Sequence, residues 1–131
     1  MAASRNAIKK DVQSKKITRS INGHQTDIVA QKFSNRIFIV ISQCDSFGSL
    51  IDIARDNPDD MRPENAEIVC SVHFLMGMED NVCKALARKL ACIVFRDSDL
   101  PILLSVALKD KSLKSFKDII EAVELVNVWE F

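Results

Sequence analysis

The feature that most constrains the fold is a short apolar run near the C-terminal end, followed by apolar residues with a different period. Residues 101–108 read Pro-Ile-Leu-Leu-Ser-Val-Ala-Leu and end at the charged turn 109–111. A run of this length between turn signals is typical of a strand that is buried on both faces. Ser112 can then cap a helix, because its hydroxyl can accept from an N–H of the first turn. Three- and four-residue steps predict that this helix is amphipathic, with the stripe Leu113, Phe116, Ile119, Ile120, Val123 and Val126.

The preceding residues predict five further strands and one further helix. Asn22-Gly23 favours a type I′ turn, so the segments on either side of it, 15–21 and 24–33, are expected to form a β-hairpin. Apolar patterns predict strands at 37–41, 49–54 and 66–76 and a helix from about Glu79 to Arg96. In the strand at 66–76, one face is expected to carry Ile68, Cys70, Val72, Phe74 and Met76, and the other Glu67, Ser71 and His73.

The order of these elements, β-β-β-β-β-α-β-α, predicts an α+β fold with an antiparallel sheet of about six strands and helices on one face. Residues 1–14 show no apolar period, so we expect a flexible basic tail followed by a single domain at 15–131. The acidic segment 55–65 contains two prolines and is expected to be a long loop.

Two of the predicted strands are apolar on both sides, which leaves one face of the sheet without a cover. Phe38 and Val40 alternate with Ile37, Ile39 and Ile41, and Leu103, Ala107 and Leu108 oppose Ile102, Leu104 and Val106. Two helices can cover only one face, and so large an exposed apolar face is unusual in a soluble monomer. We therefore expect a sheet-on-sheet dimer, with Phe38, Ile39 and Val40 as candidate partner-binding residues. The alternative is that segment 55–65 and the tail fold over this face.

The turn Lys109-Asp110-Lys111 is a second candidate partner-binding site. It joins the most buried strand to the last helix, so its backbone is expected to be held firmly while its three charges lie in water. Loops mounted in this way commonly carry recognition. The alternative is an ordinary charged turn in front of a capped helix.

Composition argues against several other functions. The chain has 18 basic and 18 acidic residues, so no net field attracts nucleic acid or a membrane surface. Its three glycines form no phosphate-binding loop, and no metal-ligand spacing joins the histidines to the cysteines. We expect a protein that is not an enzyme and needs no cofactor or metal. A thiol enzyme, with a pair such as Cys44 and His73, is the alternative.

The four cysteines, Cys44, Cys70, Cys83 and Cys92, lie inside apolar runs and form no C-x-x-C pair. This usage is typical of reduced thiols, so we expect the cytoplasm, with the nucleus as a second compartment.

Three stretches carry short motifs, of which Lys109-Asp110-Lys111-Ser112 after the apolar strand is the most specific. In chain order the motifs are Phe33-Ser34-Asn35-Arg36-Ile37 with Ser42-Gln43 and Gly48-Ser49-Leu50, then Leu75-Met76-Gly77-Met78-Glu79 with Ala87-Arg88-Lys89-Leu90, then Leu103 to Ser112 with Asn127-Val128-Trp129. Together they cover about residues 15–129 and resemble the proteasome assembly chaperone 3 family. Segment 55–65 and the longer tail depart from that family, so the resemblance implies no contact for either.

The resemblance implies a small chaperone without catalytic activity that forms a heterodimer with a structurally related chaperone. The pair would assist assembly of the alpha-subunit ring of the proteasome core particle and leave before the particle matures. The resemblance also implies a sheet-and-helix fold similar to that of the proteasome subunits, and a homodimer is conceivable for the isolated chain.

The alternative function is a roadblock- or longin-like dimerisation module of a trafficking or signalling scaffold. Such a module also pairs through a sheet, but it places a helix between its second and third strands. The present sequence predicts five strands before the first helix.

Overall fold

The computed structural model describes residues 13–43, 48–56 and 70–130. The predicted tail 1–14 and loop 55–65 lie largely outside these residues, although Gln13 and Ser14 already belong to the first strand. The elements follow the predicted order: β1 (Gln13–Ile21), β2 (His24–Lys32), β3 (Ile37–Ser42), β4 (Ser49–Arg55), β5 (Cys70–Met76), α2 (Asn81–Val94), β6 (Ile102–Ala107) and α3 (Leu113–Glu124).

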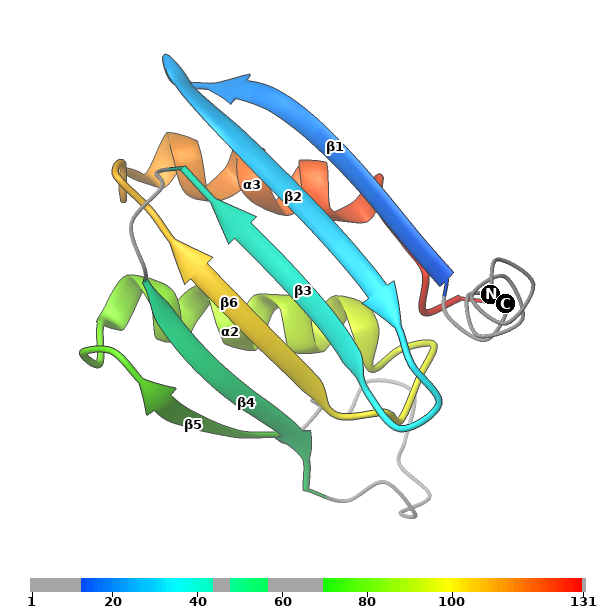
Figure 1. The fold of residues 1–131 in the computed structure, drawn as a ribbon. Helices are drawn as coiled ribbons and strands as arrows, with labels where there is room; N and C mark the ends of the chain where they lie inside the picture. Colours follow the sequence, from blue (N-terminus) through cyan, green and yellow to red (C-terminus); the bar gives the residue numbers. More distant parts are fainter. Residues whose placement is uncertain (1–12, 44–47, 57–69, 131) are drawn as a thin grey trace, which may run out of the picture.

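The six strands form one sheet in the order β1-β2-β3-β6-β4-β5, so β6 lies near its centre (Figure 1). Every neighbouring pair is antiparallel except β3 and β6, which are parallel. The expected antiparallel sheet is therefore a mixed sheet. The continuous apolar runs of β3 and β6 are compatible with a parallel pair and also with antiparallel strands buried on both faces, so the sequence pattern did not decide the direction.

The β1–β2 hairpin has the predicted turn. Asn22 and Gly23 have φ angles of 51° and 83°, the positive values that a type I′ turn requires at its two central positions. Ile21 and His24 close the ladder next to the turn, and Ile17 faces Ile28 across it. The hairpin register therefore places Ile17, Ile21, Ile28 and Ala30 on the same face of the sheet.

The edge strand β5 shows the predicted alternation over its first five residues. Cys70, Val72 and Phe74 pack against the core, whereas His73 is exposed on the other face. The prediction is wrong for Met76, which is 53% exposed, because the pairing with β4 shifts register beside Leu50. Ile68 and Glu67 lie outside the described residues.

Both helices begin at capped residues and lie on the same face of the sheet (Figure 1). The carboxylate of Asp80 accepts from the backbone N–H of Val82 at 2.7 Å at the start of α2, and the hydroxyl of Ser112 accepts from that of Ser115 at 3.3 Å at the start of α3. The predicted apolar stripe of α3 is buried or half-buried except at Leu113, which is 69% exposed because it opens the helix before its stripe meets the sheet. Neither helix has the length and apolar character needed to cross a membrane.

Helix α2 packs on β4, β5 and β6, and α3 packs on β1 and β2. The segment after α3 completes this layer, because Val126, Val128 and Trp129 are all buried. The side-chain oxygen of Asn127 accepts from the N–H groups of Trp129 and Glu130, both at 3.0 Å, and so fixes the turn that inserts the indole ring. The core thus lies between one face of the sheet and the two helices.

Candidate functional site

The turn at residues 109–111 is held by a buried glutamine that directly follows β3. The side-chain oxygen of Gln43 accepts from the backbone N–H groups of Lys109 at 3.0 Å and of Asp110 at 3.1 Å. Its side-chain nitrogen donates to the hydroxyl of Thr26 at 3.2 Å, and its backbone N–H donates to the carbonyl of Ala107 at 2.8 Å. Gln43 therefore ties together β2, β3 and the end of β6.

Two of the three charges in this turn bind other parts of the protein. The carboxylate of Asp110 accepts from the hydroxyl of Ser115 at 2.6 Å, from the side chain of Asn22 and from the N–H of Ser112. The bond from Ser115 is the largest of the causes that hold the pKa of Asp110 well below its usual range. This carboxylate therefore links the hairpin turn to the start of α3.

Lys111 forms an ion pair with Asp80, the residue that caps α2. The hydrogen bond between them lowers the pKa of Asp80 and raises that of Lys111. The charges of the turn do reach water, since Lys109 and Lys111 are exposed and Asp110 is partly exposed, but Asp110 and Lys111 also have partners within the chain. Lys109 is exposed, and its side chain has no partner among the described residues.

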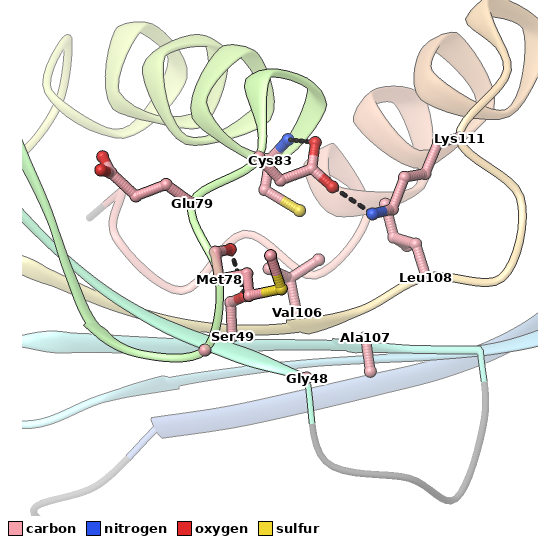
Figure 2. Close-up of a pocket in the computed structure, with 11 residues that line it drawn as sticks. Gly48, Ser49, Met78, Glu79, Cys83, Val106, Ala107, Leu108 and Lys111 are labelled. Carbon is pink, nitrogen blue, oxygen red and sulfur yellow. Dashed lines mark hydrogen bonds and ion pairs between the residues drawn. The ribbon is translucent and has the colours of Figure 1, made fainter.

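A pocket of about 490 Å³ lies beside this turn, between the end of β6 and the start of α2. Figure 2 shows Met78, Cys83 and Lys111 among the side chains that line it. Two glycines allow neighbouring segments to approach closely at the floor of the pocket. A Cβ on Gly48 would lie 2.0 Å from the carbonyl oxygen of Val106. A Cβ on Gly77 would lie 2.7 Å from the hydroxyl of Ser49. The floor of this pocket therefore depends on both glycines.

Among the described residues, the one thiol that lines this pocket, Cys83, is not activated. Burial raises the pKa of Cys83, so its thiolate form is disfavoured at neutral pH. His73 is exposed on the edge strand, and Cys44, its suggested partner in a thiol enzyme, lies outside the described residues. Within the described ranges no three His, Cys, Asp or Glu side chains are grouped as metal ligands.

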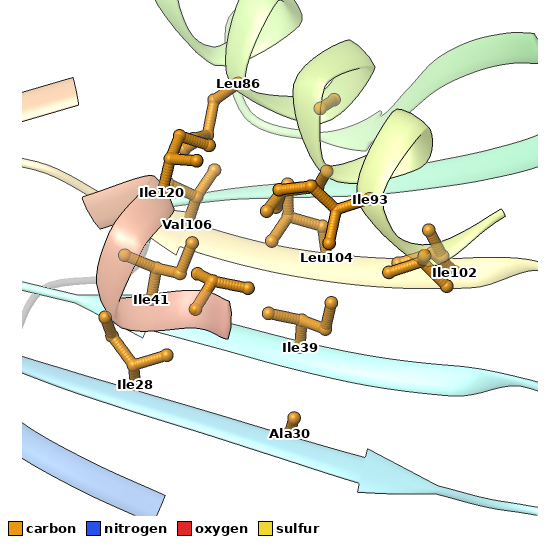
Figure 3. Close-up of a cluster of buried hydrophobic side chains, with 14 of the residues drawn as sticks. Ile28, Ala30, Ile39, Ile41, Leu86, Ile93, Ile102, Leu104, Val106 and Ile120 are labelled. Atoms are coloured by element: carbon orange, nitrogen blue, oxygen red, sulfur yellow. The ribbon is translucent and has the colours of Figure 1, made fainter. Parts of the chain in front are cut away.

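The two faces of β3 have different environments. Ile37, Ile39 and Ile41 are fully buried beneath the helices, and Figure 3 shows Ile39 and Ile41 in the same cluster as Leu86 and Ile120. The Ile39 side chain is therefore part of the core and is not available to a partner in this fold. Among the three candidates on β3, only Phe38 and Val40 point to the open face.

The open face of the sheet has an apolar centre. Phe38 lies between Gln31 on β2 and Leu103 on β6, and Val40 lies between Val29 and Ser105. These register positions place an apolar strip across the central strands, made of Val29, Leu50, Phe38, Val40, Leu103 and Ala107. Both described helices pack on the opposite face, and no other described element covers the strip.

The sequence did not predict the hydrogen bonds of Gln43 with Thr26 and the turn, or the bond from Asn22 to Asp110. Gln43 offers one signal, because an amide side chain directly after a fully apolar strand needs polar partners if it is buried. Its partners Lys109 and Asp110 are more than sixty residues away in the chain, so only the fold identifies them.

The sequence of the chain is similar to that of a known protein family. Residues 39–126 match the family described as proteasome assembly chaperone 3. Proteins of that description from Mus musculus and Homo sapiens are each 28% identical over 119 residues, which is 90% of this chain and 95% of theirs. A relative from Nematostella vectensis with the same description is 29% identical over 112 residues, covering 81% of this chain and 82% of its own.

A solved structure has the same fold. It belongs to a chaperone complex for yeast 20S proteasome assembly, and one chain superposes with a TM-score of 0.65 at 14% identity. The match covers 86% of the present chain and 96% of the yeast chain, so it includes nearly the whole sheet-and-helix arrangement. The extent of the sequence match, across both apolar strands, the turn and both helices, shows that this chain belongs to the proteasome assembly chaperone 3 family.

Proposed function

We propose that the chain is a non-enzymatic assembly chaperone of the proteasome core particle. In this proposal it pairs through the open face of its sheet with a related chaperone, and the pair promotes assembly of the alpha-subunit ring. The observation that carries the proposal is the apolar strip around Phe38 and Val40, on the face opposite the helices, in a chain of this family. The yeast chain of similar fold comes from a chaperone complex, which supports the pairing step.

The physical basis of pairing is burial of the apolar strip. Apolar area contributes about 25 cal/mol per Å² when it leaves water, and stable interfaces bury about 800 Å² on each partner. Part of this gain offsets the loss of translational and rotational freedom, so close packing at the centre of the strip decides the affinity. A second sheet with a similar apolar face fits this requirement, because two twisted sheets can pack face to face with their inner side chains interdigitated.

The chaperone activity in this proposal is steric. A preformed dimer presents a fixed surface that holds alpha-type subunits in register and excludes wrong or premature neighbours. Such a mechanism needs no nucleotide or metal. The thiols of Cys70, Cys83 and Cys92 are unpaired, which is compatible with action in the reducing cytoplasm and nucleus.

The arrangement of the strands does not favour the roadblock or longin alternative. The backbone N–H of Phe33 donates to the carbonyl of Arg36 at 2.9 Å, so a tight turn joins β2 directly to β3. Those modules place a helix at this position.

Charge substitutions on the two faces of β3 test the pairing step. Phe38→Asp places a carboxylate at the centre of the apolar strip, so the folded chain should no longer join a co-expressed related chaperone. Ile39→Asp places the same carboxylate in the core and should prevent folding. Ser20→Asp, at the exposed edge of the open face, is the matched control and should keep the complex. Sedimentation velocity of the purified variants measures these outcomes.

A complex that survives Phe38→Asp with the sedimentation coefficient and stability of the parent complex would contradict pairing through this face. Loss of the complex in the Ser20→Asp control would show that any added negative charge disrupts it, and would also argue against a specific apolar interface.

A further inference from the structure

The exposed face of α2 has an unusual composition. Between Asn81 and Arg96 the chain carries four basic residues and no acidic residue. Its water-facing side combines long cations with two small residues and carries Lys84, Ala85, Arg88, Lys89 and Cys92; Arg96 follows in the turn after the helix and is also exposed. The chain as a whole has no net charge, whereas residues 81–96 carry a local charge of four positive units.

Three of these four cations have no ion-pair partner among the described residues, whereas Lys84 pairs with Glu79. Lys84 lies 3.4 Å from the carboxylate of Glu79, and Arg88, Lys89 and Arg96 form no ion pair with any described residue. Lys84 and Arg88 are four residues apart, a spacing at which like charges repel and destabilise a helix. Helix α3 differs, because Lys114 and Lys117 alternate there with Asp118, Glu121 and Glu124. On α2, therefore, Arg88 has a cation and no carboxylate four residues before it, in contrast to the mixed charges of α3.

The position of α2 leaves this face accessible after pairing. The helix covers the side of the sheet opposite the apolar strip, so a partner on the open face does not approach it (Figure 1). Ala85 and Cys92 are exposed and small, which allows another surface to approach the helix closely between the flanking cations. An acidic protein surface would complete the missing ion pairs.

We propose that the basic face of α2, formed by Lys84, Arg88, Lys89 and Arg96, docks on an acidic surface of a proteasome alpha-type subunit. This inference rests on the proposed function and assigns to it the contact that is separate from chaperone pairing. A protein surface fits better than nucleic acid, because the exposed face of α2 has no aromatic side chain for base stacking and the whole chain has no net positive charge.

Charge reversal on the helix provides the first test. The double variant Arg88→Glu with Lys89→Glu is compared with Lys114→Glu with Lys117→Glu, which makes the same charge change on the mixed face of α3. The probe is a preparation of co-expressed alpha-type subunits, and the readout is the dissociation constant at low and at high salt. We expect the α2 variant to lose about tenfold or more in affinity at low salt and most of the salt dependence. The α3 variant should stay within about twofold of the parent.

Folding of the α2 variant is checked by thermal unfolding. Arg88→Glu removes the repulsion with Lys84, so the variant should be at least as stable as the parent while binding more weakly. If the double reversal does not fold, the neutral pair Arg88→Gln with Lys89→Gln gives the same test with a smaller expected loss.

The exposed thiol of Cys92 provides a second, independent test. Maleimide labelling followed by peptide mass spectrometry measures how fast Cys92 reacts in the free chain and in the complex with alpha-type subunits. Binding at the basic face should slow labelling of Cys92, whereas a cysteine placed on α3 by Lys114→Cys should react at the same rate in both states. Equal rates at Cys92 would overturn the inference.

The outcomes separate this inference from the function on which it rests. If the parent chain binds alpha-type subunits and the α2 variant binds them with equal affinity and equal salt dependence, this inference is wrong and the proposed function stands. If the parent binds no alpha-type subunit, both are wrong. If a fluorescent RNA binds the parent but not the α2 variant, while subunit binding is unchanged, the basic face binds nucleic acid and the inference is again overturned.

Discussion

Replacing Gln43 by leucine should destabilise the protein more than the loss of one buried polar side chain suggests. Leucine has a similar size, but it cannot accept the hydrogen bonds that the Gln43 side chain receives from the N–H groups of Lys109 and Asp110. Each donor left unpaired costs about 1–3 kcal/mol when it is buried. Lys109 is exposed, so the N–H groups of the turn can partly replace the lost acceptor with water. We therefore expect the unfolding free energy to fall by about 2–4 kcal/mol in total.

Such a loss is a large share of the stability of about 5–15 kcal/mol that is usual for a domain. Urea denaturation followed by circular dichroism measures it as a lower midpoint with an unchanged slope. Amide hydrogen exchange adds a local readout, because the N–H groups of Lys109 and Asp110 should exchange faster in the variant. Gln25→Leu, at an exposed position of the neighbouring strand, is the control and should change the stability by less than about 0.5 kcal/mol. A Gln43→Leu variant as stable as this control, with both turn amides still protected, would refute the assigned role.

Two further predictions concern the pocket floor and the turn. Gly77→Ala should lower the unfolding free energy by at least about 1 kcal/mol, because Gly77 has a φ of 89° and a Cβ there would lie 2.9 Å from the Cα of Ser49. Gly23→Ala should cost less, because a Cβ at that position would meet open space. Equal losses for the two variants in urea denaturation would contradict the close approach at Gly77. Asp110 has a lowered pKa in the folded state, so its contribution to stability is present above the unfolded-state pKa of 3.8 and is lost as pH falls below it. The difference in urea midpoint between the parent and Asp110→Asn should therefore shrink from about pH 5 to about pH 2. A difference that stays constant over this range would contradict the assignment.

Much of the fold could be predicted from local patterns. Asn22-Gly23 predicted the hairpin, and the change from strand-like to helix-like periodicity around Ser112 predicted β6 and α3 with the correct cap. These features depend on interactions between residues close in sequence, which is why the sequence alone reveals them.

The features that could not be predicted depend on contacts between distant residues. The apolar runs of β3 and β6 suit either a parallel pair or two doubly buried antiparallel strands, so the direction of their pairing depends on where α2 returns the chain to the sheet. Phe38 and Ile39 are both large and apolar, so their pattern could not decide which belongs to the core and which to the open face. The ion pair of Lys111 with Asp80 joins the starts of two helices that are 31 residues apart in the chain. The sequence therefore could not show that Lys111 has a partner within the protein.

The most direct test of the proposed function is affinity purification of the tagged chain from cells, with bound proteins quantified by mass spectrometry. The parent chain should recover a related chaperone and core-particle alpha-type subunits, with little of the mature particle. Phe38→Asp should lose the related chaperone, whereas the Ser20→Asp control should recover the same proteins as the parent. Recovery of neither a related chaperone nor any alpha-type subunit by the parent chain would contradict the proposed function.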